Sequence, residues 1–214
     1  MEGDKLWKFI IIGFTTPEEW DSPSEEAAHI TRFLQSGAID IFHLRKPDTD
    51  TGYVKEIIEK IPEHLHSRLV LHSHFHLIFH FKPGGIHHKE SCEQKFIDYG
   101  VNNRLIISKS CHSIKEVESL QKDNYEYCFL SPIYDSISKE DYKARFSIND
   151  PRLLKLNKDY RIIALGGIIP SHFQNLYAAK FAGAALLGYL WSPKTGIEEK
   201  IKYLKEARIK TTQS

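Results

Sequence analysis

The chain has 214 residues, of which 41% are hydrophobic, which is enough for a substantial core and too many for a disordered chain. Its 29 basic and 28 acidic residues give a net charge of +1, which excludes a general electrostatic attraction to nucleic acid or to an anionic membrane. Three cysteines without CxxC spacing favour reduced thiols, and we see no signal peptide and no apolar run of membrane-span length. We therefore expect a cytoplasmic protein without nucleic-acid or membrane partners.

Short runs of β-branched and apolar residues recur along the whole chain and are typical of strands that are buried on both faces of a parallel sheet. The predicted strands cover residues 8–14, 39–45, 68–72, 84–88, 104–110, 125–131, 161–167 and 183–190. Helix-like stretches with recognisable end signals lie between several of them. The predicted helices cover residues 23–36, 113–122, 170–181 and 193–208. Residues 73–82 and 89–99 are too short or too irregular to predict as helices.

The alternation of eight strands with helices over about 210 residues is typical of a (β/α)8 TIM barrel. No linker or change in composition separates a second domain, so we expect residues 1–214 to form one barrel domain. A doubly wound open sheet is the alternative, because the sequence pattern does not reveal whether the sheet closes.

The carboxyl ends of the predicted strands carry the candidate functional residues, because the active site of a TIM barrel lies at that end. The side chains at these positions are mostly cationic or hydrogen-bond donors, which suits an anionic ligand. They are His43, Arg45 and Lys46 after the second strand, His72 after the third, His87 after the fourth, and Ser110 and His112 after the fifth. His112 is the candidate general acid and base, because imidazole titrates near neutral pH.

Two further groups of residues are candidates for binding phosphate. Gly166, Gly167 and Gly188 follow the seventh and eighth strands, where TIM barrels commonly bind phosphate and where glycine lets backbone N–H groups approach it. The alternative is that the glycine pair only forms a tight turn. Ser136, Ser138 and Lys139 offer a second set of donors for an anion, and the alternative there is a solvated loop.

Six segments resemble, in order and spacing, the thiamine phosphate synthase/TenI family: HLRKPD, GIHH, SCHS, SPIYDSISK, ALGGI and GAALLGYLW. The resemblance implies a TIM barrel with a role in thiamine biosynthesis. Synthases of this family join a hydroxymethylpyrimidine diphosphate to a thiazole phosphate with Mg2+, whereas TenI-type members isomerise the thiazole phosphate. It also implies that Gly166, Gly167 and Gly188 hold the thiazole phosphate, that Ser136, Ser138 and Lys139 hold the diphosphate, and that Ser110 and His112 form the S-x-H motif.

The chain departs from the synthase pattern at the positions that serve Mg2+. The resemblance places an Asn-Asp pair after the third strand and another Asp after the fourth, where this chain has His72-Ser73 and Ser91-Cys92. His43 replaces the glutamine of the family's Q-x-R-x-K, and Lys46 comes one position early. Because Mg2+ prefers carboxylate oxygens, we expect no metal or other cofactor, with Mg2+ only if the chain is a synthase.

The stretch VLHSHFHLIF, residues 70–79, contains the alternating histidines His72, His74 and His76. A continuous strand would place all three on one face, as a metal site needs. We expect the strand to end near His72 instead, so that only this histidine faces the pocket beside a histidine of the fourth strand. The alternative is a zinc site with His72, His87 and Cys92 as its ligands.

Three functions remain open from the sequence. The expected one is a TenI-like tautomerase that binds a phosphorylated thiazole and lacks the usual Mg2+ ligands. The alternatives are a thiamine phosphate synthase and a non-catalytic paralogue that binds a phosphorylated ligand. The sequence leaves the oligomeric state open, and a homo-oligomer is one option.

Overall fold

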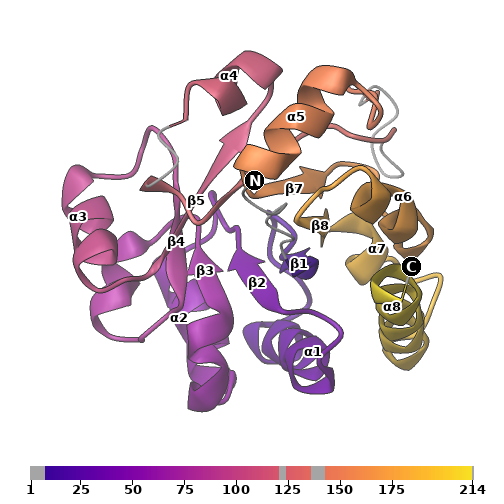
Figure 1. The fold of residues 1–214 in the computed structure, drawn as a ribbon. Helices are drawn as coiled ribbons and strands as arrows, with labels where there is room; N and C mark the ends of the chain where they lie inside the picture. Colours follow the sequence, from indigo (N-terminus) through magenta and orange to yellow (C-terminus); the bar gives the residue numbers. More distant parts are fainter. Residues whose placement is uncertain (1–7, 121–123, 136–142, 214) are drawn as a thin grey trace. The chain divides into compact units, whose positions relative to one another are not determined.

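A closed barrel of eight parallel strands organises the chain, in the order β1-β2-β3-β4-β5-β6-β7-β8. Figure 1 shows how strands and helices alternate along the chain. The computed structural model describes residues 8–120, 124–135 and 143–213. The strands are β1 (Ile10–Phe14), β2 (Ile41–Leu44), β3 (Leu69–Leu71), β4 (Gly85–His88), β5 (Ile106–Cys111), β6 (Tyr127–Leu130), β7 (Ile162–Leu165) and β8 (Gly183–Leu186). The predicted (β/α)8 fold is confirmed, and the alternative of an open sheet is wrong.

Helices follow the strands along the chain. The α-helices are α1 (Pro23–Ser36), α2 (Thr51–Lys60), α3 (Gln94–Asn102), α4 (Ile114–Glu118), α5 (Pro151–Asp159), α6 (Phe173–Ala178), α7 (Gly188–Trp191) and α8 (Ile197–Thr212). Short 3-10 helices are η1 (Glu63–Arg68), η2 (Phe75–Phe79) and η4 (Pro170–His172). None of the helices in the described part of the chain is long and apolar enough to cross a membrane.

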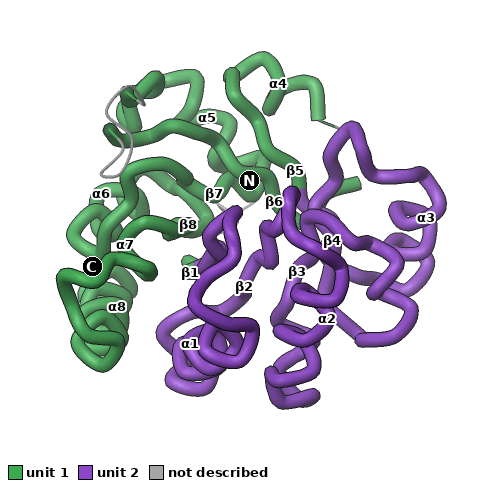
Figure 2. Tube along the Cα trace, turned by 180° about the vertical axis from the view of Figure 1, so that it is seen from behind, with its two compact units in different colours: residues 1–11, 109–214 green, residues 12–108 purple. Residues whose placement is uncertain are grey.

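The chain divides into two compact units (Figure 2). Unit 1 consists of residues 1–11 and 109–214, and unit 2 consists of residues 12–108. The two boundaries between the units fall inside β1 and β5. The expectation of one domain over residues 1–214 stays a prediction.

Unit 2 has a core of strand residues covered by α1 and α2. Helix α1 begins and ends as its sequence predicts: the Ser22 hydroxyl accepts a hydrogen bond from the backbone N–H of Glu25, and Gly37 ends the helix with a φ of 74°. Its apolar face buries Ala27, Ile30, Phe33 and Leu34. The Arg68 guanidinium donates to the backbone carbonyls of Leu34, Ile39 and Asp40, which ties the end of α1 to the start of β3.

Unit 1 contains the strands β6, β7 and β8, and helix α6 packs against β8. These three strands pair in parallel, and every residue of β6 and β8 is buried. The buried Lys200 of α8 donates to the carbonyl oxygens of Leu190 at 2.8 Å and Ser192 at 2.6 Å. Helix α8 thereby holds the segment that contains α7.

Several predicted boundaries are wrong. The predicted strand 183–190 ends at Leu186 and is followed by helix α7, and the predicted helix 113–122 contains only the short α4. The predicted helix 170–181 begins as η4 and ends at Ala178, whereas the predicted helix 193–208 begins four residues later, at Ile197. Helices α2, α3 and α5 were not predicted.

Candidate functional site

The loop after β7 in unit 1 contains Gly166 and Gly167, both with left-handed backbone conformations, at φ values of 95° and 64°. A Cβ atom on Gly166 would lie 2.9 Å from Pro132, and one on Gly167 would lie 2.7 Å from the Tyr134 carbonyl oxygen and closer still to that of Asp135. The backbone N–H of Tyr134 donates to the Gly166 carbonyl at 3.1 Å. The left-handed backbone and the close approach of the loop after β6 therefore explain why both positions are glycine, without reference to a ligand.

Gly188 is the first residue of α7, a helix of four residues that directly follows β8. A short extra helix after the eighth strand is a common part of phosphate sites in TIM barrels, together with the loop after the seventh strand. It is therefore the location of the three glycines after β7 and β8, and not the residue type alone, that favours a phosphate site.

Two aromatic side chains that sequence reasoning missed lie next to the loop after β7. The rings of Tyr134 and His172 stack with centroids 3.8 Å apart, and His172 Nδ1 lies 3.4 Å from the backbone N–H of Ile169, which donates to it. Burial raises the pKa of Tyr134 and lowers the pKa of His172. The Tyr134 hydroxyl is buried and has no hydrogen-bond partner among the described residues. In the sequence, these two residues appear only as a tyrosine within SPIYDS and a histidine within PSHF, which does not indicate that they meet.

The predicted catalytic residues Ser110 and His112 lie at the end of β5 in unit 1. His112 is exposed, and its Nδ1 atom lies 3.4 Å from the hydroxyl oxygen of the buried Ser131. Its backbone N–H donates to Glu116 at 2.9 Å, and this bond is the largest cause of the lowered pKa of the Glu116 carboxyl. Ser110 lines a cavity of about 280 Å³ together with Lys109, Cys111 and Glu116.

The residues after β2 in unit 2 differ in what they can offer a ligand. Arg45 is exposed, whereas the Lys46 side chain is fully buried, with Nζ 2.8 Å from a carboxylate oxygen of the equally buried Glu26 of α1. Lys46 also donates to the Thr16 hydroxyl at 3.4 Å. Burial raises the pKa of Glu26, and the ion pair with Lys46 opposes that shift. Lys46 therefore has a structural partner that the sequence did not indicate. The other predicted anion-binding residues, Ser136, Ser138 and Lys139, lie outside the described residues.

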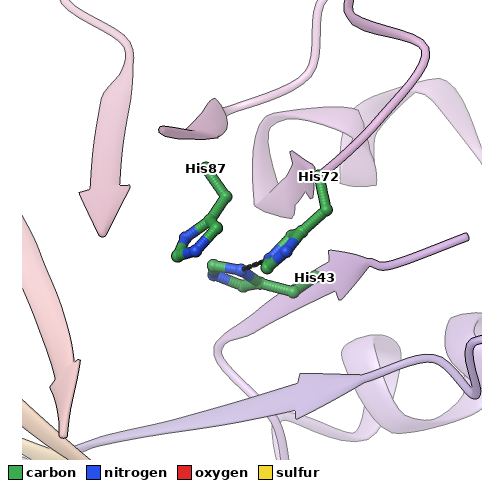
Figure 3. Close-up of side chains that lie close together, drawn as sticks. All are labelled: His43, His72 and His87. Atoms are coloured by element: carbon green, nitrogen blue, oxygen red, sulfur yellow. Dashed lines mark hydrogen bonds between the residues drawn. The ribbon is translucent and has the colours of Figure 1, made fainter. Parts of the chain in front are cut away.

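Three buried histidines meet at the ends of β2, β3 and β4 in unit 2 (Figure 3). His43 Nδ1 lies 2.6 Å from His72 Nε2, and the His72 and His87 rings stack at 4.0 Å with an interplanar angle of 12°. His87 Nδ1 makes a hydrogen bond of 2.9 Å with the hydroxyl of Ser108, a buried residue of β5. The predicted proximity of His72 and His87 is confirmed.

The stretch from residue 70 to residue 79 is divided as predicted. Strand β3 ends at Leu71, and His74 has a left-handed backbone with a φ of 52° before η2 begins. His74 bonds to the Thr51 hydroxyl at 2.8 Å, and His76 is exposed. Cys92 is not part of the cluster found among the described residues, and burial raises the pKa of its thiol to about 11. Among the described residues, the third member of the cluster is therefore His43 and not Cys92, and whether a metal binds there stays a prediction.

Comparisons with known proteins agree with this architecture and its motifs. The family model described as thiamine monophosphate synthase (TMP-TENI) matches residues 12–190. The chain belongs to the thiamine monophosphate synthase family. It is thereby a member of an enzyme family of thiamine biosynthesis.

Individual relatives of the family are distant in sequence. A thiamine-phosphate synthase of Lactococcus lactis subsp. cremoris (strain MG1363) is 24% identical over 178 residues, which cover 79% of this chain and 80% of the relative. The crystal structure of thiamine phosphate pyrophosphorylase from Bacteroides thetaiotaomicron is 29% identical with a TM-score of 0.72, and the match covers 96% of this chain and 98% of that one. Thiamine phosphate pyrophosphorylase from Pyrococcus furiosus has a TM-score of 0.72 at 13% identity over 97% of this chain and 98% of that one, which shows the fold alone.

The Mg2+ ion that the family resemblance implies does not fit the residues at its expected positions. His72 is part of a cluster of imidazoles, the Ser73 hydroxyl donates to the Lys46 carbonyl at 2.9 Å, and Cys92 is a buried thiol. Mg2+ needs oxygen ligands, usually carboxylates, in near-octahedral geometry. These positions supply an imidazole, a serine hydroxyl that is bonded to a backbone carbonyl, and a thiol, but no carboxylate.

Proposed function

We propose that this member of the family binds a phosphorylated thiazole and isomerises it by proton transfer, without Mg2+-dependent coupling to a pyrimidine diphosphate. The observation that carries the proposal is that the positions expected to serve Mg2+ hold His72-Ser73 and Ser91-Cys92 and no carboxylate, with His72 in a buried cluster of imidazoles. A diphosphate leaving group that lacks a cation would develop its negative charge without compensation. An isomerisation has no such requirement.

Unit 1 offers the parts that such a reaction needs. The phosphate would bind at the Gly166–Gly167 turn and the start of α7, and this anchoring would fix the ring relative to the acid–base group. His112 would remove a proton from one carbon-acid position and return it to another, so that it ends in its starting protonation state. The Ser131 hydroxyl, 3.4 Å from its Nδ1 atom, would orient the imidazole.

The synthase alternative has its own support, because curated relatives of the chain are named thiamine-phosphate synthase. They are only 24–25% identical to this chain, and proteins that share a fold can catalyse different reactions. A synthase would require a cation site built from residues other than those at His72 and Cys92.

The test is a pair of assays on one preparation of the protein. Incubation with hydroxymethylpyrimidine diphosphate and thiazole phosphate is expected to release no pyrophosphate, with Mg2+ or with a chelator. Isomerisation of the phosphorylated thiazole, followed by NMR, is expected to proceed and to slow by about 100-fold or more in His112→Ala, the range of general acid–base catalysis. Calorimetry should show that this variant still binds the ligand.

The same assays identify each alternative. Mg2+-dependent release of pyrophosphate would replace the proposal with the synthase function. Tight binding of the thiazole phosphate with no turnover in either assay would replace it with the non-catalytic binding function.

A further inference from the structure

The three histidines of unit 2 converge because of strand register. His43 pairs with Val70 of β3, and Leu71 pairs with Ile86 of β4, so His72 and His87 follow at the same level of neighbouring strands. Residues two apart on a strand face the same side, which places His72 on the side of Val70 and its partner His43. Figure 3 shows the three rings lying close to one another.

Among the residues that the structure describes, this is the one group of three or more histidine, cysteine or acidic side chains that could hold a metal ion. One nitrogen from each ring lies within 4.8 Å of the other two, and all three residues are at most 6% exposed. We propose that His43, His72 and His87 form a binding site for a borderline transition-metal ion, with Zn2+ as the expected occupant.

The donor set selects the class of metal. Imidazole suits zinc, copper, nickel and iron, whereas Mg2+ and Ca2+ require oxygen. Burial lowers the pKa of His43 and of His72 well below the usual histidine value, and neighbouring histidines add to the effect. A metal ion would bind the neutral form of each imidazole.

The geometry needs only side-chain adjustment to receive the ion. Zinc–nitrogen bonds of about 2.0–2.1 Å in a tetrahedral site separate the ligand nitrogens by about 3.3 Å. The 2.6 Å contact between His43 and His72 would lengthen toward that value, and the wider separations in the cluster would shorten. Binding would also require the stacked rings of His72 and His87 to tilt, because parallel imidazoles do not aim at one point.

The surroundings resemble those of known histidine ligands in two ways. The Nδ1 atom of His87 has a hydrogen-bond partner in Ser108, as the second ring nitrogen of a metal-bound histidine usually does. Phe14 lies beside the cluster, with its ring centroid 4.9 Å from that of His43 and 5.3 Å from that of His72. Three protein ligands leave a fourth position open, as in catalytic zinc sites.

The experiment is a metal titration of the full-length protein, prepared without a histidine tag and freed of metal by a chelator. Zn2+ is added in competition with a chromogenic chelator, and bound metal is counted by elemental analysis. We expect one Zn2+ per chain, and a loss of affinity of at least 100-fold in His72→Ala and in His43→Ala. Ser108→Ala should weaken binding by about 10–100-fold, the usual effect of losing an outer hydrogen bond to a ligand.

His76→Ala is the matched control, because His76 belongs to the same stretch but is exposed and outside the cluster. It should bind Zn2+ as the unmodified protein does. If His72→Ala does not fold, as circular dichroism would reveal, His72→Asn takes its place. Co2+ added to the metal-free protein should give the intense visible absorption of a tetrahedral ion, and the His72 variant should lack it.

Two outcomes would overturn the proposal: less than a tenth of an equivalent of Zn2+ bound at micromolar free zinc, or unchanged Zn2+ binding in the folded His72 and His43 variants. The titration contains no thiazole ligand. Its result is therefore independent of the proposed isomerase activity, and either can fail without the other.

Discussion

Gly37 and Gly167 both have a left-handed backbone, at φ values of 74° and 64°, but their surroundings differ. Nothing lies within 4 Å of a Cβ atom built on Gly37, whereas one on Gly167 would lie 2.7 Å from the Tyr134 carbonyl oxygen. We predict that Gly37→Ala costs about 1–2 kcal/mol, the penalty of the left-handed conformation alone. Gly167→Ala should cost clearly more, about 3 kcal/mol or above, since backbone must also move.

Urea unfolding followed by circular dichroism measures both variants. Equal losses of stability would contradict the prediction and would mean that the loop after β6 yields easily. A larger loss for Gly167→Ala would mean that substitutions at this glycine report on folding as well as on ligand binding. The phosphate site is therefore better tested by substitutions that leave the turn intact.

Contacts between residues were predictable from the sequence where the barrel topology alone sets them, and not where they depend on strand register or on one particular side chain of another element. His72 was expected beside a histidine of β4 because strand ends of a barrel meet. Lys46 was expected to bind an anion, but its partner is Glu26, twenty residues earlier on α1. His43 lies beside His72 because of the register of β2 against β3. A single sequence does not reveal that register.

Individual elements were predictable to the degree that their ends carry chemical signals. Helix α1 has the same bounds as its prediction, because Ser22, Pro23 and Gly37 mark both ends. Helix α7 was predicted as part of a strand, because the apolar run continues through residues 183–190 while the strand pairing ends at Leu186. Helices α2 and α5 also have N-cap residues, Asp50 and Asp150, but no glycine marks their C-terminal ends, where the cap residues are Ile61 and Tyr160.

The N-cap of α5 gives a prediction of pH dependence. The Asp150 carboxylate accepts hydrogen bonds from the Arg152 guanidinium and backbone, and these lower its pKa to about 2. Because the folded-state pKa lies below the unfolded value of about 3.9, the stabilisation is present above pH 4 and is lost as the pH falls toward 2. Asp150→Asn should therefore be less stable than the unmodified protein at pH 7, with a difference that shrinks below pH 4.

Thermal unfolding at a series of pH values measures that difference. Asparagine still caps a helix, so the comparison isolates the charge. Arg152→Gln removes the guanidinium that is the largest cause of the lowered pKa of Asp150. This variant should therefore also show a weaker pH dependence of its stability. A difference between unmodified protein and Asp150→Asn that stays constant from pH 7 to pH 2 would contradict the assignment.

At the scale of the whole molecule, the repeated order of strands and helices was enough to predict the barrel, because few folds accommodate eight parallel strands with intervening helices. The family followed from motifs at the strand ends, and the match to residues 12–190 confirms it. The division into two units had no counterpart in the sequence, since both boundaries fall inside predicted strands and not in linkers. A boundary within a strand is unusual for separate domains, which are normally joined by exposed linkers.

The three buried, unpaired cysteines can test whether the two units unfold together. Cys92 belongs to unit 2, whereas Cys111 and Cys128 belong to unit 1. Burial raises the pKa of Cys92 to about 11, and the hydrogen bond with Cys111 raises that of Cys128, so both should react slowly with a thiol reagent in the folded protein. Because the boundaries between the units cut β1 and β5 of a closed barrel, we predict that both become reactive in one transition.

Two double variants separate the signals: Cys92→Ala/Cys111→Ala leaves Cys128 to report on unit 1, and Cys111→Ala/Cys128→Ala leaves Cys92 to report on unit 2. Short pulses of thiol reagent across a urea series give the midpoint of exposure for each variant. Each midpoint should coincide with the loss of circular dichroism in the same variant, because strands β1 and β5 are each divided between the two units. In Cys111→Ala/Cys128→Ala, which retains Cys92, exposure of this thiol at a lower urea concentration than the loss of circular dichroism would show that unit 2 opens independently. The expectation of one cooperative barrel domain would then be wrong.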